Sequence, residues 1–149
     1  MKLGLALLLF LCCCTTKPKT ESTNAARVDV RLGRKFYSIY INKEGNGYGV
    51  RGTGSYFTEP LVVEKSDTSN FFRLDSATIF FDNIEKYKHV PFVGAKVQDA
   101  PRVEIFYLQT KIYDGYRWGV ELWNLVRPII HQLPKEYNPF LANNETFHF

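Results

Sequence analysis

The chain has 149 residues, 15% of them aromatic, and a formal net charge of +4. This length suffices for one domain with its own hydrophobic core, and the modest charge is too weak to favour a nucleic-acid partner. All three cysteines lie at positions 12–14, so the rest of the chain has no cysteine for an internal disulfide, a thiol nucleophile or a thiolate metal site.

The start of the chain has the order of an export signal. Lys2 precedes an unbroken apolar run over residues 3–11, and small thiol residues follow directly. A cation, a short hydrophobic region and a zone of small side chains are typical of a secretory signal peptide. A transmembrane helix needs roughly 20 apolar residues, so the run is too short for a permanent span. We therefore predict a signal peptide over residues 1–13.

Residues 11–14, Leu-Cys-Cys-Cys, resemble the lipobox of bacterial lipoproteins. In that family a Leu stands three residues before a cysteine that becomes diacylglyceryl-modified and forms the new N-terminus. Cys14 has Leu11 at that distance, and Cys13 stands where the family has Gly, Ala or Ser. The resemblance implies lipidation at Cys14, with Cys13 as second choice and Cys12 as third. Ordinary cleavage to a free secreted protein is the alternative.

The segment after the cysteines is polar, contains Pro18 and shows no apolar period. Such a composition is typical of a flexible connection between an anchor and a folded unit. We therefore predict a tether over residues 14–26 and a single domain over residues 27–149.

Positive charge gathers near the start of the predicted domain. Residues 17–51 carry eight Lys or Arg against three acids. Basic side chains close to a lipid anchor meet anionic head groups, so we predict a membrane-surface patch, with a solvated basic face as the alternative. The predicted patch consists of Arg27, Arg31, Arg34 and Lys35.

Several segments have the two-residue period of β-strands. Residues 36–41 alternate, with Tyr37, Ile39 and Ile41 on one face, and the glycine-containing turn at 44–47 joins them to residues 48–53 in a hairpin. Later strands are predicted at 61–63, 71–74, 92–97 and 102–108, with a turn at 66–70 and a further extension at 112–113.

Two segments have a helical period. The first runs from residue 76 to the residues before Pro91, with Asp75 or Ser76 available to cap its N-terminus. The second has an apolar stripe over residues 118–133. Pro128 lies inside that stripe and removes the donor for the Asn124 carbonyl, so a kink is expected there.

These elements predict an α+β fold. An antiparallel sheet carries a short middle helix and a longer C-terminal helix, kinked near Pro128, packed on one of its faces. A β-sandwich or a small barrel with a helical lid is the runner-up.

No pattern in the chain predicts a catalytic residue, a metal site or a cofactor. Residues 47–52 match GxGxxG, but an extended segment follows instead of a helix, so these glycines are assigned to a turn, a bulge or a close backbone approach. His89, His131 and His148 lack metal-ligand spacing and are interpreted as structural or surface residues.

Four acids lie near aromatic residues and are the ones that a hydrolase would use, although ordinary turn and cap roles explain them as well. They are Asp99, Glu104, Asp114 and Glu121. Tyrosines lining one exposed sheet face would instead favour a protein or glycan partner.

The prediction for function is a non-enzymatic binding or structural role. The protein is expected to be exported and lipid-anchored in the cell envelope, on the periplasmic or outer-surface side. Its expected partners are the membrane, through the acyl chains, and another envelope protein. An immunity-type protein that neutralises an envelope-acting toxin is one alternative, and a small hydrolase or carbohydrate-active enzyme is another.

Overall fold

The computed structural model describes residues 24–54, 62–89, 91–95, 101–116 and 120–141. Within these ranges the chain forms an open mixed sheet of eight strands with two helices, which agrees with the α+β class. The predictions that fall outside the described residues are those on residues 1–23, 61 and 96–97, and on Asp99, Trp118 and His148.

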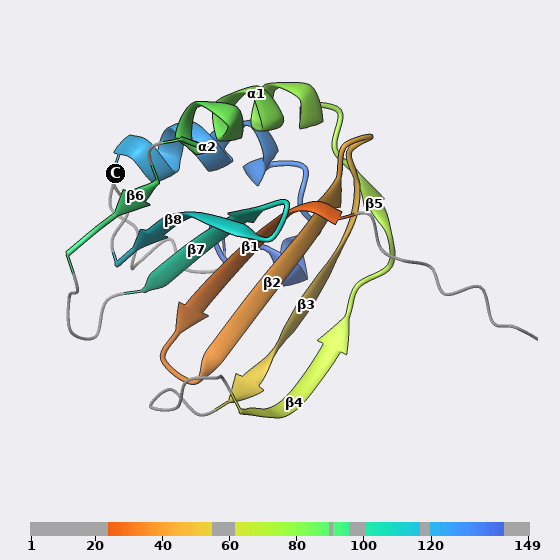
Figure 1. The fold of residues 1–149 in the computed structure, drawn as a ribbon. Coiled ribbons are helices and arrows are strands. Elements are labelled where there is room, and N and C mark those ends of the chain that lie inside the picture. The colour runs from red at the N-terminus through yellow and green to blue at the C-terminus, as the bar shows by residue number, and fades with distance from the viewer. Residues whose placement is uncertain (1–23, 55–61, 90, 96–100, 117–119, 142–149) are drawn as a thin grey trace, which may run out of the picture.

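The strands are β1 (Asn24–Leu32), β2 (Lys35–Asn42), β3 (Asn46–Gly54), β4 (Val63–Thr68), β5 (Phe72–Arg73), β6 (Phe92–Val93), β7 (Arg102–Tyr107) and β8 (Thr110–Gly115). They follow the order β4–β3–β2–β1–β7–β8–β6, and β5 pairs with β3 (Figure 1). All pairs are antiparallel except β6 and β8, which are parallel. The prediction of a wholly antiparallel sheet is therefore wrong at this edge, where the β7–β8 hairpin places β8 beside β6.

Strand β1 lies between β2 and β7 and was not among the predicted strands. It begins at Asn24, inside the segment predicted to be a tether. Val28 and Val30 are fully buried, and the charged residues that alternate with them point to the other face of the sheet. The alternation of charged and β-branched residues was the sequence signal for this strand, but the positive charge was interpreted as a surface patch.

The hairpin of β2 and β3 and the strand β7 confirm the predicted alternation. The strand predicted at 61–63 is misplaced, since β4 runs from Val63 to Thr68 and includes much of the predicted turn at 66–70. Pairing with β3 explains the difference, because Arg51 lies opposite Asp67 and its Nε is 3.0 Å from the Asp67 Oδ2.

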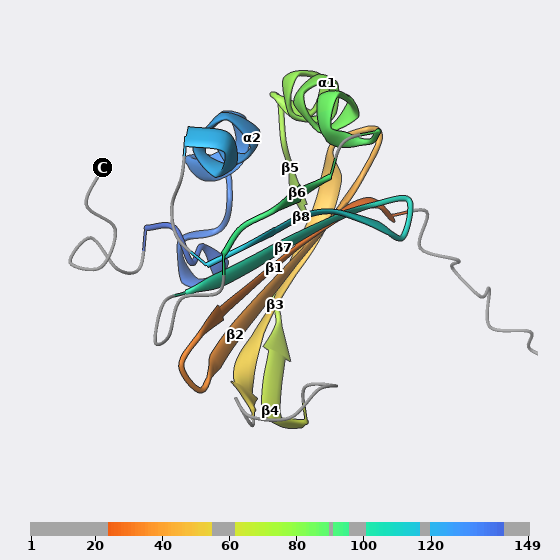
Figure 2. The same cartoon turned by 60° about the vertical axis from the view of Figure 1, so that its left-hand side comes forward.

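Helices α1 (Ala77–Tyr87) and α2 (Val120–Ile130) lie on one face of the sheet (Figures 1 and 2). Each has 11 residues, so the described part of the C-terminal helix is no longer than α1. The core lies between these helices and the sheet. Its fully buried side chains include Ile39, Ile41, Phe80, Ile84, Ile105, Tyr113, Leu122, Leu125 and Ile129.

A side-chain amide from the C-terminal segment lies at one terminus of each helix, at the N-terminus of α1 and at the C-terminus of α2. Gln132 Oε1 accepts a hydrogen bond from the Asp75 backbone N at 2.5 Å, while its Nε2 donates to Ser76 Oγ at 2.7 Å. The predicted capping by Asp75 or Ser76 is therefore wrong, because Ser76 makes no side-chain cap bond. The buried Asn138 amide donates to the Ile130 carbonyl at 2.5 Å, and α2 ends there instead of near residue 133.

Helix α2 continues through Pro128, and the Asn124 carbonyl loses its intrahelical donor there as predicted. A side chain from α1 replaces that donor, since Asn83 Nδ2 lies 2.9 Å from the Asn124 carbonyl oxygen. The proline therefore creates the acceptor that joins the two helices.

Replacing Asn83 with Ala is expected to lower the free energy of unfolding by about 1 kcal/mol, because the Asn124 carbonyl loses its donor. In a Pro128→Ala background, residue 128 regains an N–H that can bond that carbonyl within the helix. The same Asn83→Ala change should then cost less than half as much. Urea unfolding of the four chains of this double-mutant cycle measures the coupling, and equal costs in both backgrounds would contradict the bridge.

Candidate functional site: the open face of the sheet

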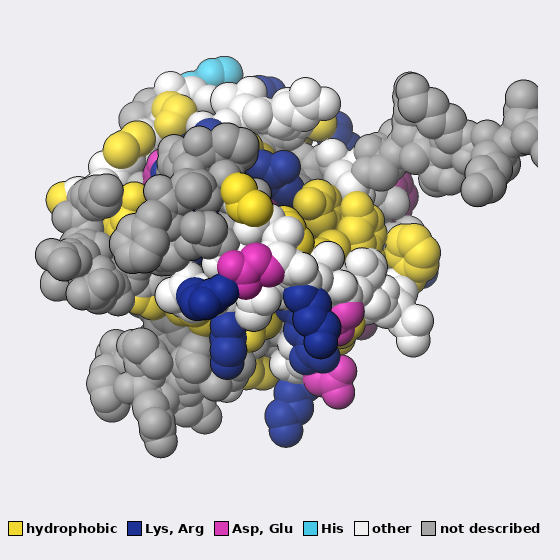
Figure 3. Space-filling view, turned by 90° about the horizontal axis from the view of Figure 1, so that it is seen from below, with side chains coloured by type: hydrophobic (Ala, Val, Ile, Leu, Met, Phe, Trp, Pro, Cys, Tyr) yellow, Lys and Arg dark blue, Asp and Glu magenta, His cyan; other side chains and the backbone are white. Residues whose placement is uncertain are grey.

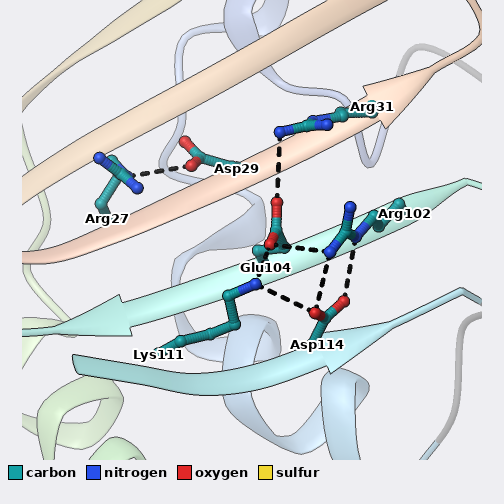
Figure 4. Close-up of polar contacts among 7 residues, drawn as sticks. All are labelled: Arg27, Asp29, Arg31, Arg102, Glu104, Lys111 and Asp114. Carbon is teal, nitrogen blue, oxygen red and sulfur yellow. Dashed lines mark hydrogen bonds and ion pairs between the residues drawn. The ribbon is translucent and has the colours of Figure 1, made fainter. Parts of the chain in front are cut away.

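The sheet face opposite the helices carries no helix in the described part of the chain, and we call it the open face (Figure 2). Three carboxylates form a row across it. The register pairs Asp29 of β1 with Glu104 of β7, and Glu104 with Asp114 of β8. Cations lie on both sides of this row (Figure 4). We call the seven residues the charged cluster: Arg27, Asp29, Arg31, Arg102, Glu104, Lys111 and Asp114.

The ion pairs of the charged cluster converge on Glu104 and Asp114. Arg102 binds Asp114 through two hydrogen bonds, Nε to Oδ1 at 3.1 Å and Nη2 to Oδ2 at 3.0 Å, and its Nη2 lies 3.2 Å from Glu104 Oε1. Lys111 Nζ donates to both carboxylates. Arg31 Nη2 lies 3.5 Å from Glu104 Oε2. Glu104 is therefore a buried carboxylate in contact with three cations.

The two outer carboxylates of the row have opposite pKa shifts. Burial raises the pKa of Asp29 above its ordinary value, and Ser38 and Arg27 only partly oppose this effect. Burial would also raise the pKa of Asp114, but hydrogen bonds from Arg102 and Lys111 outweigh it, so this pKa is lowered.

The lowered pKa of Asp114 predicts a loss of stability in acid. The stabilisation is present above the ordinary pKa of an Asp, about 4, and disappears as the pH falls through the lower folded-state value. Replacing Asp114 with Asn should therefore lower the free energy of unfolding at pH 7 and have little effect near pH 2. Urea unfolding at both pH values measures this difference, and a deficit of equal size at both would contradict the assignment.

An aromatic strip lies beside the charged cluster on the open face and consists of Tyr40, Tyr48 and Phe71. The rings of Tyr40 and Tyr48 are stacked with centroids 4.7 Å apart, and Phe71 meets Tyr48 edge-on at 5.9 Å. Phe71 is 83% exposed. Figure 3, which views the molecule from the side opposite the helices, shows hydrophobic side chains next to charged ones on this face. Stacked rings held at a surface offer contact area at a small cost in conformational entropy.

The four residues of the predicted basic patch lie on β1, in the β1–β2 turn and on β2. Arg27 and Arg31 lie on the open face and contact Asp29 and Glu104, respectively. Arg34 lies at the β1–β2 turn, where its Nη2 contacts Glu64 at 2.6 Å. Lys35 is exposed at the start of β2.

Two of the four acids considered for a hydrolase are neighbours in the structure. Glu104 and Asp114 share Arg102 and Lys111, whereas Glu121 lies on α2. The cluster also contains residues that the sequence did not single out for this role. Those residues are Asp29, Arg102 and Lys111. The only signal for Asp29 was the two-residue spacing of Arg27, Asp29 and Arg31, which places them on one face of a strand.

The GxGxxG segment lies within β3, as an extended strand instead of a phosphate loop. A Cβ added to Gly49 would lie 2.8 Å from the Tyr137 Cβ, and one added to Gly52 would lie 2.8 Å from the Phe36 ring. The nearest atom to the Cβ added at Gly52 is the Lys65 backbone carbonyl oxygen, so Gly52 is a place of close backbone approach, one of the roles predicted for these glycines, whereas Gly49 accommodates the Tyr137 side chain.

His89 and His131 are exposed. No group of three or more His, Cys, Asp or Glu side chains in the described ranges is arranged to hold a metal ion. Neither described helix has the length and apolar character needed to cross a membrane.

Comparison with protein families, with curated proteins and with solved structures finds no match to this chain. The open face must therefore be interpreted from its own chemistry.

Proposed function

We propose that the protein is an exported, lipid-anchored protein of the cell envelope that binds another envelope protein through its open face. The leader and the cysteines at residues 12–14 support the anchor. The aromatic strip beside the charged cluster is the observation that supports binding, because tyrosines and arginines dominate the energetics of protein interfaces.

The charged cluster suits recognition because its side chains are already ordered. Arg102 and Lys111 are each held by two carboxylates, so a partner would not have to immobilise them. Alternating rows of opposite charge favour a partner with the complementary pattern and oppose one without it. An immunity-type protein would be one form of such a binder, with a toxin as its partner.

A hydrolase is the second candidate. It is favoured by the raised pKa of Asp29 and the lowered pKa of Asp114 in one carboxylate row, since opposite shifts are typical of an acid and base pair. Arg102 and Lys111, however, already form ion pairs with Glu104 and Asp114. Glu104 also separates Asp29 from Asp114 in the row. Binding therefore remains the first proposal.

A photo-crosslinking amino acid placed at position 71 in the full-length chain, in intact cells, tests the proposal. We expect an adduct with another envelope protein, because Phe71 is the most exposed member of the aromatic strip. Position 79 is the matched control, since Ile79 is an exposed apolar residue on α1, on the face opposite the strip.

Adducts from position 79 alone would contradict binding through the open face. Replacing Tyr48 with Ala should reduce the adduct from position 71, because the Phe71 ring loses the ring that it meets edge-on. Labelled palmitate in the same cells tests the anchor. The label is expected in the wild type and should be absent when Cys12, Cys13 and Cys14 are all replaced by Ser.

A further inference from the structure

A hollow of about 390 Å³ opens on the open face, between the aromatic strip and the β7–β8 turn. Its volume lies within the range of binding sites for small groups. Strands β1, β2 and β7 and the turn after β7 all contribute to it. It is lined by Asn24, Ala25, Ala26, Arg27, Tyr40, Phe106 and Gln109.

The lining combines one positive charge with amides and aromatic rings. Arg27 is the only charged residue of the set, and none of the described residues that line the hollow is acidic. Asn24 and Gln109 supply amide groups, while Tyr40 and Phe106 supply ring surface. The Arg27 guanidinium lies over the Phe106 ring, with Cζ 4.1 Å from the ring centroid.

The charge of Arg27 is only partly matched by the protein. Its Nε lies 3.0 Å from Asp29 Oδ2, yet this Nε and the Asp29 Oδ1 are buried without a hydrogen-bond partner in the described part of the chain. The Arg27 side chain remains 40% exposed. By contrast, Arg102 and Lys111 each contact two carboxylates. A buried polar atom that lacks a partner costs free energy, and a ligand that reorders the group recovers part of it.

The β7–β8 turn that borders the hollow has an uncommon backbone conformation. Leu108 has φ 46° and Gln109 has φ 69°, in the left-handed region that glycine or asparagine usually occupies. The Leu108 backbone N donates to the Ala25 carbonyl at 2.8 Å, which holds the turn against β1. The position of Gln109 at the edge of the hollow is therefore set by the backbone.

We infer that this hollow receives the carboxylate of an acidic side chain from the partner polypeptide, with a neighbouring aromatic side chain of the partner stacked on Tyr40 and Tyr48. The inference rests on the proposed function and names the chemistry of the partner. A carboxylate supplies the negative charge that the lining lacks, and an arginine fork with adjacent amides is a typical carboxylate receptor.

A polypeptide suits this place better than a free small acid, because the hollow continues into the aromatic strip. Tyr40 belongs to both. A small acid would use the hollow alone, whereas a peptide would use the hollow and the strip together.

Two tripeptides, N-acetylated and C-amidated Phe-Glu-Phe and Phe-Gln-Phe, test the inference on the full-length protein in detergent micelles. We expect the Glu peptide to bind at least about tenfold more tightly than the Gln peptide. The preference should disappear in Arg27→Gln. It should persist in Arg34→Gln, the matched control at the β1–β2 turn, outside both the hollow and the charged cluster.

Arg27→Gln also removes the partner of Asp29, so a second variant keeps the test independent of folding. Gln109→Glu places a carboxylate at the edge of the hollow, in an exposed turn, and should also abolish the preference. Equal binding of the two peptides to the wild type would overturn the inference. Phenylacetate binding as tightly as Phe-Glu-Phe would assign the hollow to small acids and overturn the choice of a polypeptide.

The two proposals fail in different ways. Adducts from position 71 without a Glu preference would refute the inference about the hollow and leave binding through the open face intact. The absence of such adducts would refute the proposed function itself.

Discussion

Replacing Glu104 with Gln is expected to lower the free energy of unfolding by about 2–3 kcal/mol. The Glu104 carboxylate is buried, with a residue exposure of 5%, and it contacts Arg31, Arg102 and Lys111. Removing one member of a buried ionic network leaves the remaining charges uncompensated and typically costs 3–5 kcal/mol. We place the value lower because the three cations keep some contact with water, which screens them.

Glu64→Gln is the matched control, because it is the same change at an exposed ion pair with Arg34. It should cost less than about 0.5 kcal/mol. Urea unfolding at pH 7 measures both variants. Similar costs would show that the buried network contributes no more than a surface pair. Glu104→Gln should also weaken binding of the partner, since Arg31, Arg102 and Lys111 lose the group that orders them.

Replacing Phe80 with Ala should lower the free energy of unfolding by about 3–5 kcal/mol. Phe80 lies on α1 and is completely buried in the core between the helices and the sheet. Its truncation removes the transfer free energy of the ring and leaves a cavity that rigid neighbours fill only in part. Thermal and urea unfolding measure the loss.

Phe71→Ala is the same substitution at a position that is 83% exposed, so it should change the stability by less than about 0.5 kcal/mol. The two variants separate the two uses of phenylalanine in this protein. Phe80→Ala should reduce stability, whereas Phe71→Ala should reduce partner binding and leave the fold unchanged. A large loss of stability in Phe71→Ala would indicate that the aromatic strip supports the fold instead of a partner.

The type of most elements followed from local spacing. The two-residue period over 36–41 and 102–108 predicted β2 and β7, and the helical period after residue 76 predicted α1. These predictions succeed because side-chain direction along a strand or a helix depends only on neighbours a few residues away. The sequence also predicted that the Asn124 carbonyl lacks a donor within its own helix, because proline has no backbone N–H.

The candidate site depends on contacts between segments that are distant in the chain. Asp29, Glu104 and Asp114 form a row only because β1 pairs with β7, and β7 with β8, in particular registers. A shift of one residue in either pairing would place these side chains on opposite faces. The donor that Asn83 supplies to Asn124 likewise requires α1 to pack beside α2.

The strand and helix periods of the chain, its cysteine-free domain and the features that predict an export signal are therefore patterns a few residues long. The central position of β1, the partners of each charge and the hollow beside Arg27 come from the pairing of segments up to about 80 residues apart. Such pairing depends on how the whole apolar surface is best buried, because many registers satisfy the same local period.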